Sequence, residues 1–255
     1  MILRRLTTAF RKQDWFTVAV ETLIVVFGVF IGLQVNNWNA DRSLRAQEVG
    51  ILANIREDLA SDELQLAEGV ASANRNTQAA NYALAAASRE IADGVFFATM
   101  SSDQVQEDFS VPAQQDFDTN LAPRLWSIAV VRYHPTQSSA AFDALMASGN
   151  LGLIRDSELV AALQQYQQRW SDIEVSQNST LRPFRDHTVF VGQKFGLSAF
   201  SEMPEAEFIA LVRDNKELEA ALRTMAEYSL IHRELLAETL KVNAALQARL
   251  EAPTP

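Results

Sequence analysis

The sequence contains no cysteine. This absence excludes disulfide scaffolds, cysteine-based zinc or iron–sulfur sites and thiol catalysis. Glycine and proline are also scarce, at nine and seven in 255 residues, which argues against low-complexity disorder and against an all-β chain rich in turns. Basic residues are outnumbered by acidic ones, and the formal net charge is -10. An acidic chain is repelled by phosphate backbones, so we expect no nucleic-acid partner.

One long apolar segment lies near the N-terminus. Residues 15–35 read WFTVAVETLIVVFGVFIGLQV. As a helix, about 21 residues span roughly 30 Å, the thickness of a bilayer core. Trp15 and Trp38 stand at the two ends, where aromatic rings favour the membrane interfaces. We therefore predict a transmembrane helix over residues 15–38, with the membrane lipid bilayer as a partner, preceded by a basic cytoplasmic tail, residues 1–14.

A cleaved signal peptide is the alternative to a permanent span. Its apolar region would be shorter and would be followed by a small-x-small cleavage site, which residues 33–38 do not offer. The tail before the span holds four basic residues against one acidic residue. Because basic flanks stay cytoplasmic, we expect the N-terminus inside and residues 39–250 across the membrane, which in a bacterium is the periplasm.

Glu21, Val25, Gly28 and Gly32 recur at spacings of three and four and share one face of the predicted span. The G-x-x-x-G pair allows a second backbone to approach closely, and a carboxyl facing lipid costs about 2–3 kcal/mol. We interpret this stripe as a docking face for another transmembrane helix, either of a second copy or of a membrane complex. The alternative is that the glycine pair occurs by chance and that Glu21 reaches the nearby interface.

Polar amides follow the span directly. Asn36 and Asn37 directly precede Trp38, which lies at the interface position. Amides at this depth can hydrogen-bond lipid headgroups. We interpret the three residues as interface anchors, with contact to a partner helix as the alternative.

The stretch GVFIGLQVNNWN, residues 28–39, resembles the span end of an uncharacterised family of bacterial single-span membrane proteins, a domain of unknown function. A second stretch that carries this resemblance is AFDALMASGNLGLI, residues 141–154. The resemblance implies an inner-membrane span that continues into a helical extracytoplasmic region. It implies no activity and no catalytic residues.

The extracytoplasmic part reads as all-α. Apolar residues keep a 3/4 spacing from about residue 42 to residue 92, and no proline precedes Pro112, so the span is expected to continue as one stalk helix until Asp93 and Gly94 end it. Residues 93–136 lack a sustained period and are expected to form an irregular insertion, in which Leu125–Val131 is either a short strand or a buried turn.

Further helices are predicted after the insertion, and together with the stalk they make an antiparallel helical bundle. Gly149 suits a left-handed residue at a helix end, which explains SGNLGLI as a tight helix–turn–helix. A ligand loop of Asn150, Gly152 and Arg155 is the alternative. The first helix is predicted over 137–148 with Thr136 or Ser138 as N-cap, and the next from Asp156 or Ser157 to a kink or break at Pro183. A further helical piece runs on to about Lys194, a short helix begins near Pro204, and the last helix covers 216–250, followed by a disordered tail, 251–255.

The chain shows little sign of catalytic chemistry. The three histidines, His134, His187 and His232, fit no metal-site spacing, and His232 on an apolar stripe is interpreted as a core histidine. The acidic run Asp62-Glu63 is interpreted as a solvated face. Arg182 and Arg185, beside the proline break, are interpreted as ordinary ion-pairing residues, with an acidic-ligand site as the alternative. We expect no catalytic residue, no metal and no cofactor.

These features together predict a single-pass membrane protein rather than an enzyme. Its function is expected to be that of an interaction or accessory subunit, whose span associates with itself or with a larger membrane complex. The alternative is a periplasmic ligand-sensing module, which would need a partner because only the short basic tail remains in the cytoplasm.

Overall fold

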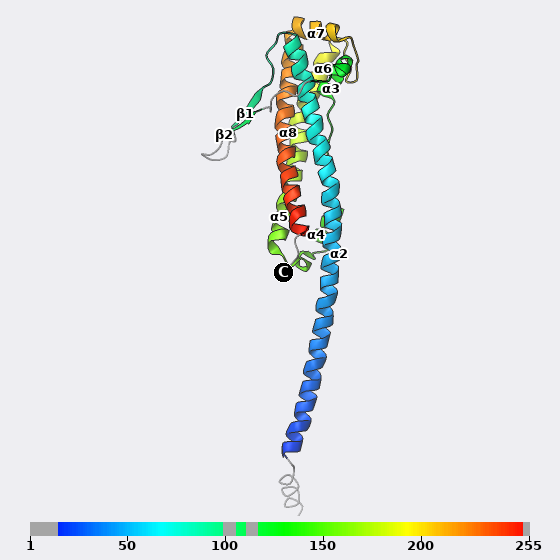
Figure 1. Cartoon of the computed structure of the whole chain (residues 1–255), viewed down its shortest axis with the longest axis vertical. Helices are drawn as coiled ribbons and strands as arrows, with labels where there is room; N and C mark the ends of the chain where they lie inside the picture. The colour runs from blue at the N-terminus through cyan, green and yellow to red at the C-terminus, as the bar shows by residue number, and fades with distance from the viewer. Residues whose placement is uncertain (1–14, 99–105, 111–116, 252–255) are drawn as a thin grey trace, which may run out of the picture.

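The computed structural model describes residues 15–98, 106–110 and 117–251. The described chain is mostly helical, and its first element is a very long helix, α2, Trp15–Ala86 (Figure 1). The prediction of a mainly helical chain with one long apolar N-terminal helix is therefore confirmed. The predicted tail, residues 1–14, lies outside the described residues, as do residues 252–255. Glu251, assigned to the second tail, belongs to the last helix.

The elements after α2 are all shorter than it, and the last of them is the longest. The last helix, α8, lies against α2 over much of its length (Figure 1). In chain order the elements are β1 Gly94–Ala98, β2 Gln106–Ser110, the 3-10 helix η1 Thr119–Arg124, α3 Leu125–Val130, α4 Ala140–Ala147, the 3-10 turn η2 Leu151–Leu153, α5 Ser157–Val175, the π-helical turn η3 Ser176–Leu181, α6 Arg182–Gln193, α7 Glu205–Asp214 and α8 Lys216–Glu251.

Contacts between α2 and α8 pair early residues of one helix with late residues of the other. The Arg56 guanidinium donates to the carbonyl of Leu250 at 3.2 Å, and the Thr77 hydroxyl lies 3.5 Å from the carbonyl of Ala226. The two helices therefore run side by side in opposite directions. Helix α5 also packs on α8.

Helix α2 ends earlier than predicted. It stops at Ala86, and Ser88 takes a left-handed conformation with φ 58°. The Arg89 N–H donates to the Leu84 carbonyl at 2.8 Å, which is the closing bond of a Schellman motif. The prediction that Asp93 and Gly94 end the helix was wrong because it looked for a glycine, whereas a serine takes the left-handed position.

The predicted insertion contains regular elements. Strands β1 and β2 form an antiparallel ribbon that pairs Gly94 with Ser110, and it extends from the side of the helices (Figure 1). The segment predicted as a strand or buried turn is the helix α3. Nearly every residue of α3 is buried, so its sequence shows no amphipathic period from which a helix could be recognised.

The later helix boundaries partly differ from the predictions. Helix α4 begins after Ser139, whose side chain makes no capping bond, whereas Thr136 or Ser138 had been predicted as the cap. Near Pro183, where a kink or break was predicted, the π-helical turn η3 separates α5 from α6, and helical turns continue through it. The predictions of Gly149 as a left-handed residue, at φ 70°, and of Asp156 as an N-cap are confirmed, since the Asp156 carboxylate accepts from the Glu158 and Leu159 N–H groups.

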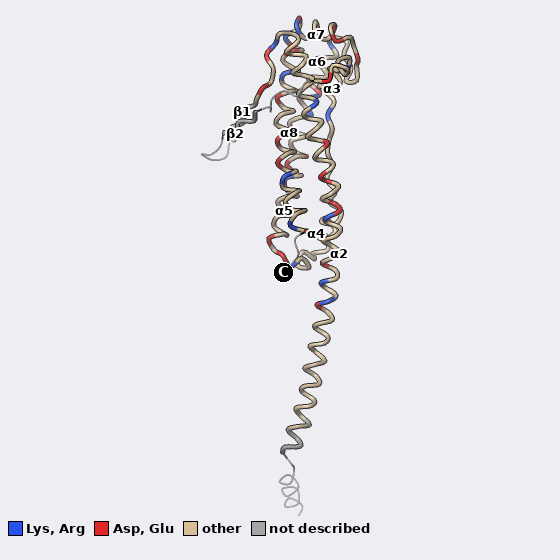
Figure 2. Tube along the Cα trace, in the orientation of Figure 1, with Lys and Arg blue, Asp and Glu red and all other residues tan. Residues whose placement is uncertain are grey.

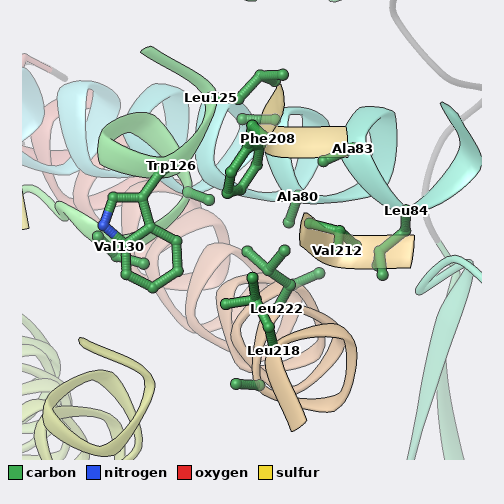
Figure 3. Close-up of a cluster of buried hydrophobic side chains, with 14 of the residues drawn as sticks. Ala80, Ala83, Leu84, Leu125, Trp126, Val130, Phe208, Val212, Leu218 and Leu222 are labelled. Carbon is green, nitrogen blue, oxygen red and sulfur yellow. The ribbon is translucent and has the colours of Figure 1, made fainter. Parts of the chain in front are cut away.

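The buried apolar residues form two clusters. One lies at the end of α2 that meets α3, α6 and α7, where Trp126 and Phe208 pack with ring centroids 6.3 Å apart (Figure 3). The other lies between the middle of α2 and helices α4, α5 and the end of α8, and includes Leu66, Trp170 and Leu236. The first cluster has small residues on α2, such as Ala80 and Ala83, which let the larger side chains approach the helix closely.

Gly192 of α6 provides a test of this packing. A Cβ atom at this position would collide with the six-membered ring of Trp126, whose indole N–H is held by the Ser198 carbonyl at 2.7 Å. Overpacking of this kind costs about 1–3 kcal/mol, which outweighs the gain of up to about 1 kcal/mol in helix propensity. We expect Gly192→Ala to lower the unfolding temperature, followed by circular dichroism of the full chain in detergent.

Gly50→Ala is the matched control. Gly50 also lies inside a helix, but a Cβ there meets nothing within 4 Å, so only the gain in helix propensity remains and the unfolding temperature should rise or stay level. If Gly192→Ala stabilised the protein as Gly50→Ala does, the close contact with Trp126 would be wrong.

Candidate functional site

The apolar part of α2 is exposed along its length. Leu23 to Val35 carry large side chains that are more than half exposed, and no charged residue lies between Thr22 and Ala40, as the uncharged lower part of α2 in Figure 2 shows. Among the described residues, α2 is the single helix that is long and apolar enough to cross a membrane, judged by length and composition. Its most apolar segment is 0% buried.

The predicted docking face is open where the structure describes it. A Cβ atom on Gly28 or Gly32 would meet nothing within 4 Å, and Val25 is 65% exposed. The side chains of Trp15 and Glu21 lie outside the described residues. The described part of the face therefore has no contact with the rest of its own chain.

The predicted interface anchors are exposed as well. Asn36, Asn37 and Trp38 all lie on the uncovered part of α2, and the guanidinium of Arg42 lies 5.9 Å from the Trp38 ring. The chain begins to pack only farther along α2, where Glu48 accepts from the Arg155 N–H at 2.8 Å. Between the two regions, residues 39–47 form about nine residues of bare helix, or about 14 Å.

Farther along, α2 carries a stripe of polar residues that holds the connection between α3 and α4, residues 131–139. This polar stripe of α2 consists of Asp58, Asp62, Gln65, Ser72 and Asn76. Its spacings of three, four and seven place the five residues on one face. The connection has no regular hydrogen bonding of its own, and buried backbone groups require partners.

The stripe satisfies the connection from one end to the other. The Ser72 hydroxyl accepts from the Tyr133 N–H at 3.1 Å, and Asn76 donates to the Val131 carbonyl at 2.8 Å. The Asp58 carboxylate accepts from the Ala141 N–H at 2.9 Å. Asp58 thus does for the first turn of α4 what Thr136 or Ser138 had been predicted to do, which explains why α4 has no local side-chain cap.

Asp62 is the most buried member of the stripe. It is 1% exposed, and it accepts from the Ser138 N–H at 2.6 Å and from the Tyr166 hydroxyl at 2.9 Å. Asn243 of α8 in turn donates to the Tyr166 oxygen at 2.8 Å. One carboxylate therefore ties together α2, α5, α8 and the α3–α4 connection. The interpretation of Asp62-Glu63 as a solvated face was wrong for Asp62, although its place on the apolar stripe was a usable signal.

Burial raises the pKa of Asp62 to about 6, and the nearby Asp58 adds to the rise. The hydrogen bonds from Ser138 and Tyr166 act in the opposite direction by stabilising the carboxylate. The same burial and the Asp62 charge raise the pKa of Tyr166 above its usual range. Tyr166 therefore stays protonated and serves as a donor to Asp62.

A second polar group lies at the π-helical turn η3. Gln177 is 2% exposed, accepts from Arg132 at 2.8 Å and hydrogen-bonds the His232 ring. Burial lowers the pKa of His232 to about 3, with a smaller contribution from the Arg132 charge, so the imidazole is neutral. His232 is the buried, hydrogen-bonded core residue that its place on an apolar stripe had predicted. Gln177 stands on the same apolar stripe as Ile173 and Leu181, which was a usable signal for its burial, whereas Arg132 shows no local sequence signal.

The two arginines predicted as a possible ligand site lie next to this group. Arg182 begins α6 immediately after η3, and Arg185 forms an ion pair with Asp186. Both lie close enough to Arg132 for their charges to lower its pKa. The structure therefore brings a third arginine to the predicted pair, from a segment some 50 positions earlier.

A cleft of about 390 Å³ opens between the α3–α4 connection and α5. It is lined by His134 and Gln137 on one side and by Gln167, Trp170 and Glu174 on the other. Gln137 and Gln167 hydrogen-bond each other at 2.6 Å, so two of the polar groups at the cleft are already paired. Within the described ranges, no group of three or more histidine, aspartate or glutamate residues is arranged to hold a metal ion.

No family model matches the chain, and comparisons with curated proteins and with solved structures give no match. The family resemblance of residues 28–39 and 141–154 therefore stays a prediction.

The raised pKa of Asp62 predicts a pH-dependent stability. The folded chain holds the proton up to about pH 6, whereas the unfolded chain releases it near the ordinary value of 3.8. This contribution is fully present below the unfolded value and is lost as the pH rises through the folded value. A shift of this size corresponds to about 3 kcal/mol.

We expect the free energy of unfolding of the native chain to fall relative to that of Asp62→Asn between about pH 4 and about pH 7. Urea unfolding of the full chain in detergent, followed by circular dichroism at several pH values, measures the difference. Glu57→Gln, which removes an exposed acid of the same helix, is the control and should run parallel to the native chain. Parallel curves for Asp62→Asn as well would show that folding does not raise the pKa of Asp62.

Proposed function

We propose that the protein is a single-pass inner-membrane protein whose antiparallel helical bundle lies in the periplasm and whose span docks another transmembrane helix. In this role it is an interaction or accessory subunit, associating either with a second copy or with a larger membrane complex. The observation that carries the proposal is the contrast within α2. Its apolar, uncharged part is exposed, whereas the part that bears the polar stripe packs against the other helices.

An apolar surface of this length is not stable in water. Monomeric soluble proteins rarely expose a contiguous apolar patch of more than a few hundred Å², whereas here the side chains from Leu23 to Val35 are uncovered on every side. A helix satisfies its own backbone hydrogen bonds and can therefore enter lipid. The bilayer is the partner that suits a bare helix of this composition.

The face of the span that carries Gly28 and Gly32 supports docking to a further helix. In lipid there is no hydrophobic drive for two helices to associate, so association depends on close backbone packing at small residues. Neither glycine packs against any other residue that the structure describes. Glu21 lies on the same face by its spacing, and a carboxyl at that depth is more stable against protein than against lipid.

The charges at the two ends of the span support the orientation. The charged residues before it are four basic ones and one acidic one, which favours the cytoplasm, while the packed region beyond Glu48 carries the acidic excess of the chain. In this arrangement the bundle is a rigid extension, and the bare helix between Asn36 and Glu48 holds it away from the bilayer.

A first test concerns the anchor and its orientation. We expect the full chain to remain in the membrane pellet after an alkaline wash and to need detergent for release. Alkaline phosphatase fused after Glu251 should be active, because that enzyme folds only outside the cytoplasm, and the same enzyme fused before Met1 should be inactive. Recovery of the chain in the alkaline supernatant, or cleavage just after Trp38, would contradict the anchor.

A second test concerns the docking face. We expect Gly28→Leu and Gly32→Leu each to reduce association of the span in a membrane two-hybrid assay to half or less, because each adds a side chain where two backbones would meet. Val26→Leu adds volume on the opposite face of the same span, and Gly50→Leu adds it to the helix beyond the span. Both controls should associate as the native chain does.

Equal association of all four variants would remove the docking face and leave a plain anchor. Crosslinked pull-down from native membranes, with the native chain beside Gly32→Leu, then identifies whatever the face contacts. Recovery of the chain itself supports self-association, and recovery of a different protein that is lost with Gly32→Leu supports a complex.

A further inference from the structure

Gln177 of the π-helical turn η3 contacts two arginines, the Arg132 side chain of the α3–α4 connection and the backbone N–H of Arg182. Arg132 of the connection donates from its Nη2 to Gln177 Oε1 at 2.8 Å, which fixes its guanidinium against η3. Its Nε is buried and has no hydrogen-bond partner among the described residues. A buried N–H group without an acceptor costs free energy, so the Nε–H of Arg132 would be stabilised by an acceptor.

The π-helical turn brings Arg182 toward the same place. In η3 the Arg182 N–H bonds the carbonyl of Gln177, five residues earlier, so the turn is wider than that of an α-helix. In an α-helix two residues five apart differ by about 140° around the axis. The wider turn reduces this angle and sets Arg182 closer to the face on which Gln177 holds Arg132. Arg185 follows three residues later on the first turns of α6, again on a neighbouring position.

Positive charge is in excess at this place. Arg185 forms an ion pair with Asp186, while the Arg182 side chain forms no ion pair with any residue that the structure describes. Burial, and after it the charges of Arg185 and Arg182, lower the pKa of Arg132 to about 10. The charge of Asp186 acts in the opposite direction and raises this pKa. Three guanidinium groups with one carboxylate partner are unusual in a chain whose net charge is -10.

We propose that Arg132, Arg182 and Arg185 form a binding site for the oxyanion group, carboxylate or phosphate, of a small soluble ligand. The planar guanidinium matches both groups in geometry and can bind them through two parallel hydrogen bonds. Arg132 is the fixed, half-buried member, and the more exposed Arg182 and Arg185 close on the ligand from the solvent side. Asp186 competes with the ligand for Arg185.

The position of the site along α2 excludes the headgroups of the protein's own membrane as the anion. Val131, next to Arg132, is bonded to Asn76, which lies forty residues after Asn36. Forty residues of helix span about 60 Å. The ligand therefore comes from the aqueous phase. This proposal is independent of the docking role of the span, because it concerns the opposite end of the molecule.

Titration of the purified full chain in detergent tests the site. Inorganic phosphate, malonate and sodium chloride are added separately at matched ionic strength, and the unfolding temperature and the calorimetric Kd are measured. Saturable stabilisation by phosphate alone identifies a phosphate ligand, by malonate alone a carboxylate ligand, and by both a general oxyanion site. If chloride stabilises the chain equally, or if no anion does so, the site does not exist.

Variants distinguish the site from general charge effects. Arg182→Gln and Arg185→Gln should each raise the Kd of the stabilising anion about tenfold, since a hydrogen bond to a charged group is lost. Arg213→Gln is the matched control, because Arg213 also pairs with the next residue, Asp214, and it should leave the Kd unchanged. Asp186→Asn should lower the Kd several-fold by freeing Arg185.

The last variant gives a sign that a purely structural role would not produce. Loss of the Arg185 partner would destabilise a structural ion pair, but it strengthens an anion site. A higher Kd in Asp186→Asn, or an equal loss in Arg213→Gln, would overturn the proposal. Neither result bears on whether the span docks another helix.

Discussion

The unbroken backbone hydrogen bonding of α2 is the constraint on which the rest of the structure depends. Every helical residue between Trp15 and Ala86 belongs to one element, and no proline interrupts it. The helix therefore couples two surroundings that differ in polarity, an apolar part with no contact to its own chain and a packed part that carries the core. The rotation of one part about the axis fixes the rotation of the other, so the exposed glycine face and the polar stripe keep a constant relation.

The polar stripe of α2 solves a problem that the α3–α4 connection creates. An extended segment packed against helices leaves N–H and C=O groups without the partners that a helix or sheet would supply, and each one costs about 1–3 kcal/mol when it is buried and unpaired. Side chains at Asp58, Asp62, Ser72 and Asn76 take these groups. Burial of the Asp62 charge costs free energy, and the hydrogen bond that Asp62 accepts from the connection offsets part of that cost.

Local signals in the sequence were sufficient for the long helices and for several of their ends. Gly149 and Asp156 were found because each acts within a few residues of itself, through a left-handed turn and through an N-cap. The end of α2 at Ala86 was missed because residues other than glycine seldom take a positive φ, so Ser88, which does so here, gave no signal.

The candidate site was largely beyond prediction for a different reason. Arg132, Gln177 and His232 come from three elements, and their contacts join residues 45 and 55 positions apart. Asp62, Gln177 and His232 each stand at an apolar position of a periodic stripe, and burial was predicted from this placement for His232 alone. Asp62 was interpreted as exposed because acidic residues usually are. The partners of the three side chains could not be predicted, because they come from distant elements.

The division of the core into two apolar clusters gives these buried polar groups a common role. On α8 the first cluster ends at Leu230 and the second begins at Leu236, and His232 and Arg233 are buried between them. Two uniform apolar surfaces can slide by a helical turn at little cost, but a slide of α8 against α2 and η3 would leave His232 and Gln177 without each other. Buried hydrogen bonds that can be made in one register alone specify that register. The buried polar groups between the two clusters thus hold α8 in place along α2. They also fix Gln177 in the position in which it bonds Arg132.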